Sequence, residues 1–230
     1  MCHVYVLHPP GGVVGGDVLE ISVHVGPEAK VLLTTPAAGK FYRSAGQRAR
    51  VSQHFTVEGT GVLEWLPQEN IFHNAARVET SSKFSLMRNA ALISIDISCF
   101  GLPAGCEDFV SGSCRQRIEI EHDGRPIYVE TTRYSPDNGL FEAPWGMGGY
   151  CIGGQLLAFP ADESRLTPLR EQCGSPDGVL SAATLLDGVL SVRCLGNDAE
   201  TIRMYLQSVW KWLRPRMLMR PAVAPRIWAT

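Results

Sequence analysis

The stretch Leu19-Glu20-Ile21-Ser22-Val23-His24-Val25 alternates apolar and polar side chains without a break. Successive side chains of a β-strand point to opposite faces, so this two-residue period is that of a strand with one face buried and the other in water. The stretch follows directly on a run rich in Gly and Pro, residues 8–17. We therefore predict a half-buried strand that starts at the end of a loop.

Similar short runs follow along the first two-thirds of the chain, separated by polar or Gly-containing turns. They cover residues 31–35, 50–57, 62–66, 77–84, 92–97, 115–122 and 126–134. Asp123-Gly124, between the last two runs, is typical of a two-residue hairpin turn. Many short strands at nearly regular spacing predict a mainly β fold, which is a sandwich, a barrel or a solenoid-like stack. No sequence repeat selects among these three.

The pattern changes at about Gly149. A β-α-β-β-α unit is expected there, with strands over 150–159, 179–185 and 189–195, a helix over 162–172 and a final helix. The second and third of these strands are expected to be joined by a turn at Asp187-Gly188. The final helix is expected to begin at an Asn197 N-cap with Glu200 as its reciprocal partner and to end at Pro215. Its apolar stripe, which predicts packing in the core, comprises Ile202, Tyr205, Leu206, Val209, Trp210 and Leu213. The chain thus divides into a strand-rich part (1–148) and a mixed part (149–230).

Composition narrows the class of protein. The 230 residues include 21 Lys and Arg and 23 Asp and Glu, a net charge of −2, which gives no reason to expect nucleic acid or an anionic membrane as the main partner. No apolar run is long enough to span a membrane, so we expect a cytoplasmic protein. The seven cysteines form no Cys-x-x-Cys pair, and most of them are expected to be small core side chains.

Motifs of catalysis are absent from the sequence. There is no G-x-x-x-x-G-K-[ST] phosphate loop, no H-E-x-x-H helix and no G-x-S-x-G elbow. A β-rich hydrolase would need a nucleophile and a base brought together from distant strands. A ligand-binding β module would need a closed apolar pocket instead. The sequence gives no positive support to either alternative.

Carboxylates within otherwise apolar strands are the more informative residues. Glu64, Asp96 and Glu130 lie in such strands, and Asp17 and Glu107 lie at loop ends. Burying an unpaired carboxylate costs several kcal/mol. These residues therefore either face solvent on half-exposed strands or line a water-filled passage or a cation site. Thiol and imidazole donors lie close together in the sequence at only one place, which contains Cys2, His3 and His8.

The run at residues 8–17 is a loop with few side chains. It contains His8, Pro9, Pro10, Gly11, Gly12, Gly15, Gly16 and Asp17. The prolines hold the backbone extended, and the glycines permit another backbone or a ligand to approach closely. This predicts either a set of tight turns or a rigid loop that ends in a carboxylate.

Several strings resemble the UreD (UreH) family of urease accessory proteins. They are residues 2–17, 32–36 (LLTTP), 40–44 (KFYRS), 63–69 (LEWLPQE), 96–109, 212–215 (WLRP) and 225–230 (PRIWAT). Together they cover essentially the whole chain, which is therefore expected to be one domain over residues 1–230. Members of the family usually carry an upstream segment that this sequence is expected to lack.

The resemblance implies a function. Proteins of this family are non-catalytic maturation factors that bind the urease apoprotein and help to deliver nickel to it, together with a second scaffold protein and a GTPase. Nickel would pass transiently, with no tightly bound cofactor. The fold implied is a mainly β, irregular, β-helix-like stack of short strands with a few helices, through which a water-filled tunnel carries the ion.

The resemblance also assigns residues. Two family motifs are matched, by residues 8–17 and by Lys40, Phe41, Tyr42, Arg43 and Ser44, the second being either a packed structural turn or a partner-facing tunnel mouth. The candidate carboxylates of the ion path are Asp17, Glu64, Asp96, Glu107 and Glu130. Cys2 and His3 are candidate ligands where the ion enters.

Overall fold

The computed structural model describes residues 1–102 and 107–229. In these residues the chain is mainly β, with two α-helices, α1 (Glu163–Gln172) and α2 (Ala199–Leu218). Two short 3₁₀ turns cover Pro136–Asn138 and Arg226–Ala229. The helices of this part of the chain include none that is both long and apolar enough to cross a membrane.

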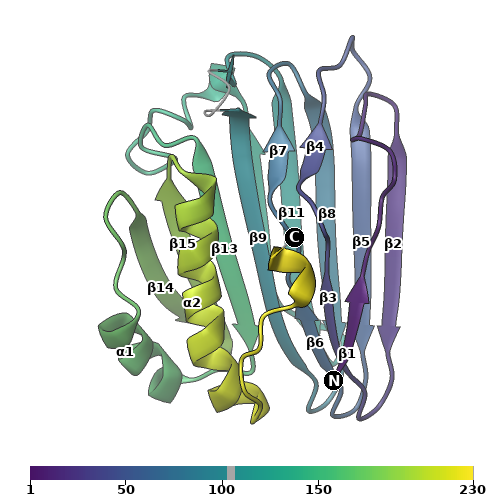
Figure 1. Ribbon diagram of the computed structural model, residues 1–230, viewed down its shortest axis with the longest axis vertical. Coiled ribbons are helices and arrows are strands. Elements are labelled where there is room, and N and C mark those ends of the chain that lie inside the picture. The colour runs from purple at the N-terminus through teal and green to yellow at the C-terminus, as the bar shows by residue number, and fades with distance from the viewer. Residues whose placement is uncertain (103–106, 230) are drawn as a thin grey trace.

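The strands form two sheets (Figure 1). The small sheet has the order β12-β11-β8-β5-β2, with β2 (Val18–Val25), β5 (Ala49–Val57), β8 (Arg77–Leu86), β11 (Ser113–His122) and β12 (Arg125–Tyr134). The large sheet has the order β1-β3-β6-β9-β13-β15-β14, with β1 (Cys2–Tyr5), β3 (Lys30–Thr34), β6 (Val62–Trp65), β9 (Ala91–Leu102), β13 (Ile152–Phe159), β15 (Val189–Gly196) and β14 (Leu180–Leu186). Three short strands extend it: β4 (Gly39–Phe41), β7 (Asn70–Phe72) and β10 (Glu107–Asp108).

The chain passes from one sheet to the other and back. It leaves β2 for β3, β5 for β6 and β8 for β9. The strands β2, β5, β8 and β11 run parallel to one another, and so do β3, β6 and β9. Each turn of this path adds one strand to each sheet, which is the geometry of a β-solenoid. The predicted mainly β, helix-like stack is confirmed, and it replaces the barrel and sandwich alternatives.

The mixed C-terminal part continues the large sheet. Strand β13 pairs antiparallel with β9, and β15 and β14 follow outward, so the predicted β-α-β-β-α order is confirmed. Both predicted two-residue turns are present, with positive φ at Asp123, Gly124, Asp187 and Gly188. The hairpin signals in the sequence therefore correctly predicted two strand pairs.

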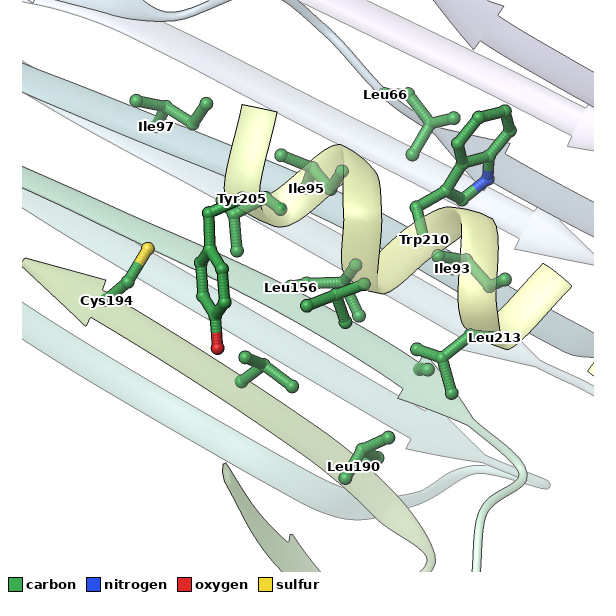
Figure 2. Packing of buried hydrophobic residues seen from close by; sticks show 14 of the residues in the cluster. Leu66, Ile93, Ile95, Ile97, Leu156, Leu190, Cys194, Tyr205, Trp210 and Leu213 are labelled. Carbon is green, nitrogen blue, oxygen red and sulfur yellow. The ribbon is translucent and has the colours of Figure 1, made fainter. Parts of the chain in front are cut away.

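Helix α2 packs its apolar stripe on the large sheet. Figure 2 shows Tyr205, Trp210 and Leu213 lying over Ile93, Ile95 and Leu156, and all of these residues belong to one buried cluster. The residues of the predicted stripe are all buried. Helix α2 thus covers the outer face of the large sheet over β9, β13 and β15 (Figure 1).

Both predicted ends of this helix were wrong. The N-cap is Asp198, whose carboxylate accepts a hydrogen bond from Thr201 N at 2.7 Å, while the Asn197 side chain accepts from Cys151 N at 3.0 Å. Pro215 lies inside the helix, which continues to Leu218. A proline removes one backbone hydrogen bond, and burial of Leu213 and Leu218 on either side of it offsets that loss in the last turn.

The space between the two sheets is apolar at both ends. One cluster includes Phe55, Phe84 and Leu92, and the other includes Phe72 and Phe100. Between these two apolar clusters the inward-facing side chains are polar, and this layer positions the candidate site.

Candidate functional site

A polar layer crosses the interior of the solenoid between the two apolar clusters. Along β9 the inward positions run from Leu92 through Ser94, Asp96 and Ser98 to Phe100, so only the middle of the strand is polar. Neighbouring strands repeat the pattern in register, since Asp96 pairs with Gln155 of β13, which pairs with Arg193 of β15. The small sheet contributes three facing residues to this layer, Gln53, Gln116 and Glu130.

Asp96 is at the centre of the polar layer. Its carboxylate accepts a hydrogen bond from Asn70 Nδ2 at 3.2 Å, and Ser98 Oγ and Gln116 Nε2 each lie 3.5 Å away. These partners are neutral, and none of the ion pairs among the described residues includes Asp96. Desolvation raises the pKa of Asp96 to about 6, and the nearby negative charge of Glu130 adds to the rise. The hydrogen bonds stabilise the ionised carboxylate and therefore act in the opposite direction.

Glu130 is held differently. Its Oε2 accepts hydrogen bonds from Tyr128 Oη at 2.5 Å, Arg193 Nη2 at 2.8 Å and Gln155 Nε2 at 3.0 Å. Burial raises the pKa of the Tyr128 phenol, and the Glu130 carboxylate beside it acts in the same direction. Arg193 is 57% exposed, so this ion pair marks the end of the polar layer that reaches solvent.

Two cavities meet at Asp96. One, of about 100 Å³, lies between Asp96, Gln116, Glu130 and Arg193. The other, of about 170 Å³, lies on the opposite side. Residues that line the second cavity include His8, Gly11, Gly12, Lys40, Gln53, Asn70 and Asp96. Each is large enough for several waters, and each offers the polar partners that buried water needs. Because Asp96 lines both cavities, one titratable carboxylate lies between them.

The Gly-rich loop, residues 8–17, covers the second cavity and packs on β4 and the residue that follows it. Val13 N donates to Lys40 O at 2.7 Å, and Tyr42 N donates to Val13 O at 2.9 Å. A Cβ on Gly12 would lie 2.5 Å from a ring carbon of Tyr42 and 2.7 Å from Lys40 O. Position 12 requires glycine because Tyr42 and Lys40 approach it closely. Residues 8–17 and 40–44 therefore pack together as one unit.

That unit has a buried side and an exposed side. Phe41 is buried and stacks on Phe72, with ring centroids 4.8 Å apart. Tyr42 is exposed and stacks on the His73 ring at 5.1 Å, and Arg43 beside it is exposed. In the second motif, Phe41 packs in the interior, the exposed Lys40 lines the second cavity, and Tyr42 and Arg43 are exposed.

Comparison with known proteins identifies the family. The family model described as UreD urease accessory protein matches residues 1–229.

The chain belongs to this family.

Curated relatives named urease accessory protein UreD match over nearly all of this chain. The Citrobacter koseri protein is 39% identical over 234 residues, which cover 100% of this chain and 79% of that protein. The Alcanivorax borkumensis protein is 42% identical over 233 residues, 99% of this chain and 78% of that protein. The Pseudomonas putida protein is 42% identical over 232 residues, 100% of this chain and 80% of that protein.

In this UreD-family chain, three of the five candidate carboxylates lie away from the polar layer. Asp17 accepts from Val14 N at 2.9 Å and closes the end of the Gly-rich loop. Glu107 lies 2.9 Å from His73 Nδ1 and accepts from Asn74 N at 2.8 Å, and the His73 hydrogen bond lowers its pKa. Glu64 is fully buried against Arg214. Only Asp96 and Glu130 are brought together.

The candidate ligands at the start of the UreD-family chain do not converge. Cys2 and His3 are neighbours on β1, and adjacent side chains of a strand point to opposite faces. Among residues 1–102 and 107–229, no group of three or more His, Cys, Asp or Glu is arranged to hold a metal ion. Cys106 lies outside the described residues. Within the described part of the UreD-family chain, the polar layer therefore presents separate carboxylate and amide oxygens and no cluster of metal ligands.

The amides of the polar layer were missed by sequence reasoning, which searched for charged and metal-binding residues. Asn70, Gln116 and Gln155 contact the two central carboxylates, and Arg193 pairs with one of them. A signal was present, because the inward side of several predicted strands turns polar at its centre. These polar positions can be recognised as one layer only when the register of the UreD-family strands is known.

Proposed function

We propose that this chain acts in urease maturation as a scaffold that guides nickel along the polar layer toward the urease apoprotein. Membership of the UreD family supports a role in urease maturation. The observation that carries the nickel route is the position of Asp96, which lines both cavities and has no cationic partner among the described residues.

The chemistry of the polar layer is suited to transit of an ion. Nickel prefers imidazole ligands, and a route of carboxylate and amide oxygens binds it weakly. Weak successive sites permit release, whereas a closed cage would retain the ion. Protonation of Asp96 near pH 6 competes with nickel, so the route conducts best above that pH.

The protein partners follow from the same proposal. The urease apoprotein receives the ion, a second scaffold protein shares the binding surface, and a GTPase supplies nucleotide hydrolysis, since this sequence has no phosphate loop. The chain itself is proposed to be non-catalytic and cytoplasmic. Burial raises the pKa of the Cys99 and Cys194 thiols to about 12, which keeps them protonated and poor nucleophiles.

The test is co-expression with the urease structural subunits and the other accessory proteins. Asp96→Ala is expected to lower urease activity and nickel content at least tenfold while the chain still co-purifies with the apoprotein. The matched control is Glu171→Gln on the exposed side of α1, which is expected to leave both values unchanged. Full nickel loading by Asp96→Ala would refute the nickel route, and failure of the unaltered chain to bind the apoprotein would refute the scaffold role.

A further inference from the structure

One end of the outer face of the small sheet is crowded with arginine. The six residues, which we call the arginine face, are Arg48, Arg50, Arg77, Arg115, Arg117 and Arg133. All six are exposed. Both α-helices make their main contacts with strands of the large sheet, so neither covers this face. The concentration is notable in a chain whose net charge is −2.

The register places these charges side by side. Arg50, Glu79, Arg115 and Arg133 form one row across β5, β8, β11 and β12. Arg115 and Arg133 are direct partners on adjacent antiparallel strands. Like charges directly opposite one another destabilise a strand pair, so this arrangement lowers the stability of the sheet. Local arrangements that oppose folding are typical of functional sites.

Carboxylates balance only part of the positive charge of the arginine face. Glu79 is the only carboxylate of the row, and it serves both Arg48, at 2.6 Å, and Arg50, at 3.5 Å. The hydrogen bond from Arg48 lowers the pKa of Glu79 and keeps it charged. Arg117 pairs with Glu119 at 2.5 Å. Among the described residues, no ion pair includes Arg77, Arg115 or Arg133.

The arginine face ends in a hollow of about 590 Å³. Three arginines line it, Arg48, Arg77 and Arg133, against a single carboxylate, Asp137, whose Oδ1 accepts a hydrogen bond from Ser135 Oγ. Its size exceeds that of a single small anion and accommodates several side chains. Guanidinium groups match carboxylates with two parallel hydrogen bonds, so this lining fits an acidic peptide well.

We propose that the arginine face docks an acidic segment of a partner protein, rich in Asp and Glu. Charge complementarity selects this occupant. A nucleic acid would also be attracted by the positive charge. However, the two rows that contain Arg115 and Arg117 have no Phe, Tyr or Trp on which bases could stack. The net negative charge of the chain also disfavours binding of a nucleic acid. The arginine face is separate from the polar layer and does not depend on the nickel route.

The test uses a fluorescein-labelled decapeptide of glutamate and fluorescence anisotropy with the whole chain. Unaltered protein is expected to bind it, and the double variant Arg115→Glu/Arg133→Glu to bind at least tenfold more weakly. The matched control is Arg125→Glu, an exposed arginine at the opposite end of β12, which is expected to change the affinity less than twofold. Binding is expected to weaken as salt is raised.

A folding control accompanies the test. The single variant Arg133→Glu converts a like-charge pair into an opposite-charge pair, so its melting temperature is expected to rise while its affinity falls. Loss of binding together with a higher melting temperature cannot come from unfolding. Equal loss in Arg125→Glu, no binding by the unaltered chain, or tighter binding of a ten-nucleotide single-stranded DNA would overturn the proposal.

Discussion

Nε of Arg214 lies 2.9 and 3.0 Å from the two carboxylate oxygens of Glu64, and both side chains are buried. Trp210 Nε1 donates to the same carboxylate at 2.7 Å. Desolvation raises the pKa of Glu64, and the hydrogen bonds from Trp210 and the charge of Arg214 oppose that rise. The pair joins β6, in the second turn of the solenoid, to the last helix.

Removing one partner of this pair is expected to destabilise the protein strongly. Glu64→Ala leaves a buried guanidinium without a counter-charge, and we expect the free energy of unfolding to fall by about 3–5 kcal/mol. Urea denaturation measures this loss. The double variant Glu64→Leu/Arg214→Met is expected to recover most of it, because no buried charge remains. A loss below about 1 kcal/mol in the single variant would contradict the pairing.

Asp96 is expected to make stability depend on pH. Its pKa is about 6 in the folded protein against an ordinary value of 3.8, so its contribution to stability is full below pH 3.8 and is lost as pH rises through 6. Relative to Asp96→Asn, unaltered protein is expected to lose at most about 3 kcal/mol between pH 4 and pH 8. Urea midpoints of both proteins over this range provide the measurement. Parallel curves would show that Asp96 has an ordinary pKa.

The Gly-rich loop offers a matched pair of substitutions. A Cβ on Gly12 would clash with Tyr42 and with the carbonyl of Lys40, so Gly12→Ala is expected to lower stability by about 1–3 kcal/mol. Gly11→Ala is the control, because nothing lies within 4 Å of a Cβ at that position. Thermal unfolding of the two variants distinguishes them. Equal effects would mean that the loop does not pack as closely as the structure shows.

Helix α2 is expected to depend on its buried stripe. Leu213 is completely buried beneath the helix, and Leu213→Ala is expected to cost about 2–5 kcal/mol through lost contacts and the cavity that remains. Met204 lies on the same helix and is 62% exposed, so Met204→Ala should change stability by less than about 0.5 kcal/mol. Chemical denaturation of both variants is the measurement. Similar losses would indicate a helix that is not docked on the sheet.

The spacing of apolar residues along the sequence predicted most of the helices and strands, because each strand of this fold either has one solvent-exposed face or is a long apolar run. The expected strand over 115–122 is β11 (Ser113–His122), and that over 126–134 is β12 (Arg125–Tyr134). Short strands such as β4 and β7 were missed, since three residues show no period. The solenoid path itself came from family resemblance, because long-range pairing leaves no local signature.

The candidate site was predictable only in part. Asp96 and Glu130 were singled out as carboxylates in apolar strands, and the structure brings both to the polar layer. Glu64 has the same local sequence pattern, yet its partner Arg214 lies 150 residues away along the chain. Whether a buried carboxylate meets a guanidinium or a cavity depends on tertiary contacts, which residue spacing does not encode.

The polar layer also has a consequence for biogenesis. Its residues come from strands as distant as β5 and β15, so a partly synthesised or partly folded chain has no complete polar layer. Parallel pairing between distant strands makes such folds slow to assemble. The polar layer is therefore complete only after β15 has joined the large sheet, near the end of synthesis and folding.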